Sequence, residues 1–317
     1  MKARRPAHSS DAPALRSGLV VASHGRHCLV ETPEGQRVRC HPRGKKLQAV
    51  VGDRVQWLPT QDEGTIEHIE PRRNLLYRSD ELRSKSFAAN LDQVLILVAA
   101  EPEFSEQQLA RALIAAEAAG IAARIALNKQ DLAGPFAAAW QRLGPYRAMG
   151  YPVHALSLES AAAETLPALT DTLQGRATLV LGPSGAGKSS LINRLAPGAQ
   201  AQTGEISQAL QSGRHTTTST TWYWLDADRR SALIDSPGFQ EFGLHHIEPT
   251  ALATLMPDLA AHLGQCRFYN CTHLHEPGCG VSAAVGQAAP AGIHPNRYRI
   301  YRELFEELSQ PRFAGTR

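Results

Sequence analysis

The chain has few of the features that mark membrane or disulfide-stabilised proteins. Its 317 residues contain no run of 18 or more apolar residues, so we expect no membrane-spanning helix. The first 18 residues are basic and polar, and the absence of an apolar segment among them argues against a secretory signal. Five cysteines are too few for a disulfide framework and favour a reducing compartment. These absences predict a cytoplasmic protein that contacts no membrane.

Aromatic residues are also scarce, at 6% of the chain, and only Trp57 and Tyr77 fall between residues 18 and 80. That stretch consists of short β-rich runs separated by turns and shows no helical period. About five such runs predict a small barrel such as an OB-fold. Because stacking side chains are few, we expect such a barrel to contact phosphates and shape rather than bases. Cys28 and Cys40 lie in strand patterns without C-x-x-C spacing, so we expect core thiols there.

The net charge of +3 hides an asymmetry along the chain. Residues 1–90 hold 16 Lys and Arg against 10 Asp and Glu, a net charge of +6, so the remainder carries −3. A basic first third predicts an anionic partner that this part contacts, with an ordinary solvated surface as the alternative. The candidates for phosphate contacts are Arg37, Arg39, Arg43, Lys45, Lys46, Arg72 and Arg73.

A phosphate-binding loop is the clearest motif of the chain. Residues 182–189 read G-x-x-x-x-G-K-S, after the apolar run 177–181 and before a helical pattern. In such a strand–loop–helix unit, backbone N–H groups surround phosphate oxygens. Lys188 adds a positive charge, and the Ser189 hydroxyl can bind Mg²⁺. The residues expected at the nucleotide are Gly182, Ser184, Gly185, Ala186, Gly187, Lys188, Ser189 and Ser190.

The region before this loop alternates between strand and helix patterns. Strands are predicted over residues 91–99, 121–127 and 151–157, and helices over 106–119 and 137–150. This alternation predicts a doubly wound parallel sheet, in which ligands bind beyond the carboxyl ends of the strands.

A guanine-recognition motif follows the second of these strands. Asn128-Lys129-Gln130-Asp131 reads N-K-x-D, the tetrad found in GTPases. The Asp131 carboxylate can accept from guanine N1–H and the 2-amino group, a pair that adenine lacks. Asn128 can donate to the base and tie this loop to the phosphate loop, and the stem of Lys129 can lie over the base. Ser157 stands where GTPases carry a base-supporting serine, although Leu158 replaces the alanine that usually follows.

The two switch elements of a GTPase follow the phosphate loop. Residues 213–218 read G-R-H-T-T-T, a polar loop suited to switch I, where Thr217 is the candidate ligand of Mg²⁺. Residues 235–238 read D-S-P-G, in which Asp235 would hold Mg²⁺ through water and the Gly238 N–H would meet the γ-phosphate. Phe239 stands where Ras-type enzymes place a water-orienting glutamine. We therefore predict His215 as the residue that positions the attacking water, together with Lys188 and Thr217 in catalysis.

The order of these motifs is a circular permutation of the usual one. Ordinary Ras-like GTPases run from the phosphate loop to a late guanine tetrad, whereas here the tetrad comes first. As a consequence, switch II leads straight into the C-terminal part of the chain. A domain joined there can respond directly to the nucleotide state.

Three cysteines and one histidine lie within 14 residues near the C-terminus. Cys266, Cys271 and Cys279 with His273 form a Cys₃His set, which suits a closed, structural Zn²⁺ site. His275 is a competing ligand two residues further on. Residues 298–308 predict an amphipathic helix, whose Arg297, Arg299 and Arg302 form either a second RNA-facing surface or a solvated face.

Taken together, the permuted order, G-R-H-T-T-T, D-S-P-G, the N-terminal β module and the C-terminal cysteines resemble the ribosome small-subunit-dependent GTPase A family. The resemblance covers nearly all of residues 18–308. It implies an OB-fold, a circularly permuted GTPase domain and a zinc domain with His273 as the histidine ligand. It also implies GTP hydrolysis that is stimulated by the 30S subunit during late maturation of that subunit. The resemblance further implies that a switch I histidine takes part in this hydrolysis.

The expected organisation is therefore multidomain. We predict a disordered basic arm over residues 1–17, an OB-fold β-barrel over 18–80, a circularly permuted α/β P-loop GTPase domain over 81–245 and an α-helical zinc-binding domain over 246–317. The expected cofactors are GTP or GDP, Mg²⁺ and one structural Zn²⁺. The expected partner is the 30S subunit through its 16S rRNA, contacted by a monomer that binds no DNA. The alternatives are another translation- or tRNA-related GTPase, or a passive RNA-binding zinc protein with a weak nucleotide site.

Overall fold

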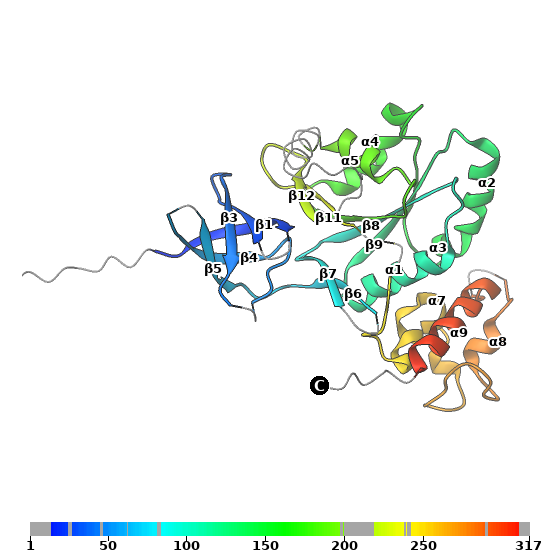
Figure 1. Cartoon of the computed structure of the whole chain (residues 1–317). Coiled ribbons are helices and arrows are strands. Elements are labelled where there is room, and N and C mark those ends of the chain that lie inside the picture. Colours follow the sequence, from blue (N-terminus) through cyan, green and yellow to red (C-terminus); the bar gives the residue numbers. More distant parts are fainter. Residues whose placement is uncertain are drawn as a thin grey trace, which may run out of the picture. The chain divides into compact units, whose positions relative to one another are not determined.

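The computed structural model describes residues 14–24, 27–44, 47–61, 63–80, 84–196, 199, 219–237, 239, 242–288 and 291–310. The chain divides into two compact units, Met1–Arg72 and Arg73–Arg317 (Figure 1). The division falls eight residues before the predicted end of the barrel domain, because the hairpin that contains Tyr77 belongs to the second unit. In the described part of the chain, no helix combines the length and apolar character needed to cross a membrane.

The first unit is a closed barrel, as the short β-rich runs predict. Its strands are β1 (Arg16–His24), β2 (His27–Glu31), β3 (Arg37–Pro42), β4 (Arg54–Pro59) and β5 (Gly64–Ile69). They pair in the order β1-β2-β3-β5-β4, and a β1–β4 pairing closes the ring. Only the β3–β5 pair is parallel among the pairs described within this unit. The unit is thus an OB-like barrel.

Alternating apolar residues fill the barrel interior. The core contains Trp57, which is 1% exposed, and both thiols of the unit, Cys28 and Cys40. The two cysteines lie opposite each other on β2 and β3, and burial raises their pKa values to about 12 and about 11. They are core thiols, as expected. Gly64 lies so close to Trp57 that a Cβ there would come within 2.6 Å of the ring.

The second unit is built on a mostly parallel sheet. Its strands are β8 (Gln93–Ala99), β9 (Ala122–Asn128), β10 (Val153–Ala155), β11 (Ala177–Leu181), β12 (Thr221–Trp224) and β13 (Ala232–Asp235). They run in the order β10-β9-β8-β11-β13-β12, and only β12 is antiparallel to its described neighbour in this set. All seven residues of β8 are buried, as a central parallel strand requires.

Helices cover the sheet and place its loops. Helix α1 (Glu106–Ala118) packs on β8 and β9. Residues of α4 (Ala162–Leu173) and α5 (Lys188–Leu195) share a core cluster with β8 and β11. The helix predicted over residues 137–150 is wrong as a single element: it divides into α2 (Ala133–Arg142) and α3 (Gly144–Ala148). Pro145 has no N–H to continue the α2 hydrogen-bond ladder, so the chain turns at Gly144 and starts a new helix.

A hairpin connects the segment that follows switch II to the start of this unit. Its strands are β6 (Leu75–Ser79) and β7 (Ser84–Ala89). The Ser79 N–H donates to the Gly243 carbonyl at 3.0 Å, and the His245 N–H donates to the Ser79 carbonyl at 2.9 Å. Segments separated by more than 160 residues are thereby joined.

The C-terminal part is helical and irregular. It contains η1 (Pro249–Leu255), α7 (Pro257–Ala260), η2 (Leu263–Gln265), α8 (Gly280–Ala284) and α9 (Pro295–Ser309). Helix α9 buries Ile300, Tyr301, Leu304 and Leu308, at the spacing of one helix face. The suggestion that Arg297 faces RNA is wrong: it is 2% exposed and donates to Asp258 of α7 at 2.9 and 3.1 Å. Arg297 lies on the buried face of α9, where the Asp258 carboxylate neutralises its charge.

Candidate functional site

The phosphate loop lies between β11 and α5. Gly185 and Gly187 have positive φ angles of 81° and 98°, which side chains with a Cβ rarely adopt. Gly182 approaches the neighbouring strand so closely that a Cβ would lie 2.5 Å from the Leu97 carbonyl oxygen. The glycines of the motif are therefore required by the backbone path, which turns around a space at the N-terminus of α5.

The start of α5 and the end of β13 bring two opposite charges together. Lys188, the first residue of α5, makes an ion pair with Asp235, the last residue of β13. Burial raises the pKa of the Asp235 carboxyl, and the Lys188 charge acts against that rise. An ammonium beside a buried carboxylate suits a phosphate group on one side and a hydrated divalent cation on the other.

Asn128 bridges two loops around the same space. Its Nδ2 donates to the Ala186 carbonyl at 3.0 Å, and its Oδ1 accepts from the Leu158 N–H at 3.1 Å. The side chain is 4% exposed. One Nδ2 hydrogen stays free for a base, because an amide nitrogen carries two. The predicted hydrogen bond from Asn128 to the phosphate loop is present. The same side chain also hydrogen-bonds to the loop after β10.

The carboxylate of the tetrad is held by the predicted serine. Ser157 Oγ donates to Asp131 Oδ1 at 2.6 Å and lies 2.7 Å from Ser160 Oγ. The hydrogen bond from Ser157 lowers the pKa of Asp131, which keeps the carboxylate ionised and able to accept only. Leu158, the residue that departs from the usual pattern, is buried and contributes its backbone N–H to Asn128. Its side chain belongs to the core cluster of the sheet and also lines the cavity described next.

Asn128, Asp131 and Lys188 line a cavity of about 760 Å³, whereas Ser157 and Asp235 lie behind its lining. This volume is within the range of small-ligand sites. Its walls come from the end of β9, the loop after β10, the phosphate loop and the residues after β13. Sequence reasoning did not single out five lining residues, and their only signal was a place within or beside the motifs: Leu132, Glu159, Pro183, Ser236 and Pro237. Phe239 also lines the cavity and is 5% exposed. Its ring lies edge-to-face with that of Phe242, with the ring centroids 6.4 Å apart.

Several predicted residues lie outside the described part of the chain. These are His215 and Thr217 of switch I, Gly238 of switch II, and Lys45 and Lys46 of the barrel. Their roles stay predictions.

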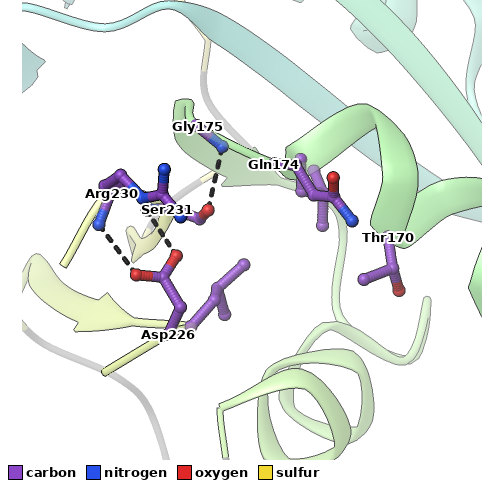
Figure 2. A pocket seen from close by; sticks show the side chains of 8 residues that line it. Thr170, Gln174, Gly175, Asp226, Arg230 and Ser231 are labelled. Carbon is purple, nitrogen blue, oxygen red and sulfur yellow. Dashed lines mark hydrogen bonds between the residues drawn. The ribbon is translucent and has the colours of Figure 1, made fainter. Parts of the chain in front are cut away.

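A second hollow, of about 580 Å³, lies beside the amino-terminal ends of β11 and β13 (Figure 2). It is lined by the C-terminal end of α4 and by the turn between β12 and β13. Asp226 accepts from the backbone N–H groups of Arg230 and Ser231, each at 2.8 Å, and the Ser231 hydroxyl accepts from Gly175 N–H. These groups satisfy one another and hold the turn. None of the motif residues lines this hollow.

The barrel arginines predicted as phosphate contacts are largely paired. Arg37, Arg39 and Arg43 make ion pairs with acidic residues of the barrel. Arg72 donates two hydrogen bonds to Asp53, a fully buried carboxylate. Arg72 is therefore a structural residue of the barrel, and the other pairs reduce the free positive charge of this surface.

The cysteine cluster has the geometry of a metal site. Ligand atoms of Cys266, Cys271, His273 and Cys279 all lie within 4.8 Å of one another. His273 Nδ1 is 3.5 Å from the sulfurs of Cys266 and Cys279. Tetrahedral ligands at Zn²⁺ distances are separated by about 3.3–3.8 Å, so the donor set and its spacing fit Zn²⁺. His275, the competing ligand, is exposed and lies outside this cluster.

Helix α9 supports the histidine of the cluster. His273 has a positive φ of 60°, and its carbonyl accepts from the Tyr298 hydroxyl at 2.7 Å. The Tyr301 hydroxyl donates to the preceding carbonyl, of Thr272, at 2.7 Å. The two tyrosines hold the backbone in the conformation that turns the imidazole toward the sulfurs.

Comparison with known proteins agrees with this arrangement. Residues 69–245 match the sequence model of the RsgA GTPase family. A protein of Variovorax paradoxus named small ribosomal subunit biogenesis GTPase RsgA is 66% identical over 98% of both chains. A Ralstonia pickettii protein of the same name is 50% identical over 92% of this chain and 93% of its own.

Solved structures show the same fold. YjeQ from Thermotoga maritima has a TM-score of 0.72 at 31% identity, over 94% of this chain and all of that one. YloQ, described as a circularly permuted GTPase, has a TM-score of 0.68 at 26% identity, over 98% of this chain and all of that one. The permuted order and the family resemblance seen in the sequence are thus confirmed. The chain belongs to the RsgA GTPase family and is a GTP-hydrolysing enzyme.

Proposed function

We propose that this enzyme hydrolyses GTP on the small ribosomal subunit, is stimulated by that subunit, and acts as a checkpoint late in its maturation. The observation that carries the proposal is the 66% identity, over nearly the whole chain, to a protein named for small-subunit biogenesis. The working environment that follows from it is the cytoplasm, and the proposed partner surface includes 16S rRNA. We propose that the protein acts as a monomer.

We propose nucleotide-binding roles for residues of the cavity and of the two switch elements. Asp131 accepts from the guanine edge, and Asn128 keeps the loops on both sides of the base in register. Lys188 would contact the phosphates, and the Ser189 hydroxyl and Thr217 would hold Mg²⁺ directly while Asp235 would hold it through water; the ion would supply charge neutralisation of the phosphates. The Gly238 N–H meets the γ-phosphate.

Water activation is assigned to switch I. Phe239 lines the cavity with a hydrocarbon side chain that neither donates nor accepts hydrogen bonds, so it cannot orient the attacking water. His215 is the proposed positioning group, since an imidazole can accept a hydrogen bond from water. We propose that the small subunit stimulates hydrolysis by positioning this histidine against the attacking water.

The segment after switch II provides the means of a checkpoint. Phe242 stacks on Phe87 of β7 with ring centroids 5.4 Å apart. The Phe242 carbonyl accepts a hydrogen bond from Arg111 of α1 at 3.3 Å. Arg111 also forms a bidentate ion pair with Glu307 of α9. Sequence reasoning missed Arg111, because nothing in the chain marks a contact across 196 residues. Movement of switch II would therefore reach both the hairpin and the C-terminal helix.

The Cys₃His cluster is proposed to hold one structural Zn²⁺. All four ligands are protein groups, which leaves no open position for a substrate. The metal would fix the loop of residues 266–279, which hydrogen-bonds to α9. It would thereby help to hold α9 in the position where Glu307 pairs with Arg111 of α1.

The proposal is tested by GTP turnover of the wild type and His215→Ala, each alone and with 30S subunits, 50S subunits or tRNA. We expect slow turnover alone, on the order of 10⁻⁴–10⁻² s⁻¹ as for unassisted GTPases, and stimulation by 30S only. His215→Ala should lose the stimulated rate while retaining GDP binding. Equal stimulation by 50S or tRNA would contradict the assignment to the small subunit.

A further inference from the structure

Two arginines of the second unit share one neutral partner at the amino-terminal edge of the sheet. Arg124 Nε donates to Gln93 Oε1 at 2.8 Å, and Arg176 Nη1 donates to the same oxygen at 3.1 Å. Gln93 is the first residue of β8, Arg124 lies early in β9, and Arg176 immediately precedes β11. The phosphate loop begins at the other end of β11, which is five residues or about 17 Å away.

The glutamine is fixed in this orientation. Gln93 is fully buried, and its Nε2 donates to the Thr172 carbonyl and to Thr178 Oγ1, each at 2.9 Å. Because a carbonyl can only accept, the amide nitrogen must face α4 and the amide oxygen must face the arginines. One neutral oxygen therefore holds two guanidinium groups side by side.

The positive charge of this pair is not neutralised within the described part of the chain. Neither guanidinium makes an ion pair with any described carboxylate. Asp92, the neighbour of Gln93, pairs with Arg73 through one oxygen and accepts from the Ala177 N–H through the other. Burial lowers the pKa of Arg124, and the like charge of Arg176 adds to that shift. Each guanidinium retains N–H donors, since it carries five.

A third polar group lies near Arg124. His154 of β10 has a buried Nε2 with no hydrogen-bond partner in the described structure. Burial lowers the pKa of His154, and the charge of Arg124 lowers it further, so the ring is neutral at pH 7.

We propose that Arg124 and Arg176 form an anion site for a backbone phosphodiester of RNA, at the opposite end of the sheet from the nucleotide. A phosphate group has several oxygens, each of which can accept hydrogen bonds, and guanidinium groups donate pairs of N–H bonds to such oxygens. Two adjacent guanidinium groups therefore suit a phosphate. The anion site rests on this geometry alone. Its occupant rests on the proposed function, because a ribosomal partner presents phosphodiesters on its surface.

The site is tested first on the full ¹⁵N-labelled chain saturated with GDP and Mg²⁺, so that the phosphate loop is occupied. Inorganic phosphate and hexauridylate are added separately while the arginine Nε–H resonances are followed. We expect both probes to shift two resonances that disappear in the Arg124→Gln/Arg176→Gln variant. A shift with inorganic phosphate alone would overturn the RNA assignment, and no shift with either probe would overturn the site.

The second measurement is the salt dependence of 30S binding. Loss of both arginines should reduce the slope of log K against log salt by about 1–2, whereas Arg124→Lys/Arg176→Lys should preserve it. Arg230→Gln is the matched control, because Arg230 is exposed and already paired with Asp228. An unchanged slope in the glutamine variant would refute the RNA contact. If 30S binds none of the proteins, the proposed function fails, and the resonance shifts still test the site.

Discussion

Replacing Asn128 with alanine should weaken GDP and GTP binding far more than the loss of one contact to the base would suggest. The Asn128 side chain closes two hydrogen bonds to backbone groups, the Ala186 carbonyl and the Leu158 N–H. Ala186 and Leu158 are 1% and 2% exposed, so water cannot easily replace the amide. The variant leaves a donor and an acceptor unpaired in loops on opposite sides of the nucleotide.

The magnitude follows from these two groups. Each unpaired buried group costs about 1–3 kcal/mol, and relaxation of the loops recovers part of that sum. In the free variant the loops can separate and relieve this cost, and nucleotide binding must bring them back together. A net cost of about 2–4 kcal/mol on binding, at about 1.4 kcal/mol per tenfold, weakens affinity by roughly 30- to 700-fold. Asn128→Asp should fare no better, because it keeps the acceptor for Leu158 but places a negative charge against the Ala186 carbonyl.

The assay is a fluorescence titration with a labelled GDP in the presence of Mg²⁺, with thermal unfolding measured alongside. Asn296→Ala is the matched control, since Asn296 accepts only from the exposed Arg299 on α9. It should bind GDP as the wild type does. Binding by Asn128→Ala within threefold of the wild type would refute the reasoning that the bridge organises the cavity.

Three further outcomes are expected. Asp131→Asn should shift preference from guanosine toward xanthosine nucleotides, measured by competition binding, and an unchanged preference would remove Asp131 from the base site. Removal of zinc with a chelator should lower the unfolding temperature and expose thiols to a colorimetric reagent, and Cys279→Ser should show both effects without treatment; equal thiol reactivity before and after chelation would contradict a bound metal. Arg111→Gln should reduce the difference in hydrogen exchange of α9 between the GDP and GTP-analogue states while leaving nucleotide affinity within about threefold; an unaltered difference would exclude Arg111 from the coupling.

The sequence predicted those parts of the structure that depend on local chemistry. The phosphate loop and the N-K-x-D tetrad could be placed because glycine, lysine and carboxylate at fixed spacing have few other uses. The barrel could be predicted from turn spacing, and the Cys₃His set from its donor atoms. The proline at position 145 also carried a local signal, namely that a helix over residues 137–150 would lose a hydrogen bond there.

What the sequence did not reveal depends on contacts between distant segments. Arg297 is part of an amphipathic pattern that permits exposure, and only its packing against Asp258 shows that it is buried. Arg37 and Arg72 count as free charge in the composition, yet their partners Glu31 and Asp53 neutralise them. Trp57 likewise belongs to the barrel interior, for which the turn pattern gave no assignment.

The permuted order also has a consequence for synthesis on the ribosome. Strand β8 is paired with β9 on one side and with β11 on the other, but β11 begins at Ala177, after residues 100–176 have been made. At translation rates of about 5–20 residues per second, one edge of this strand, which is fully buried in the finished fold, stays unpaired for about 4–15 s. An uncovered edge of that kind invites pairing with other chains. A GTPase whose own sheet completes so late should therefore depend on chaperone protection while it is being translated.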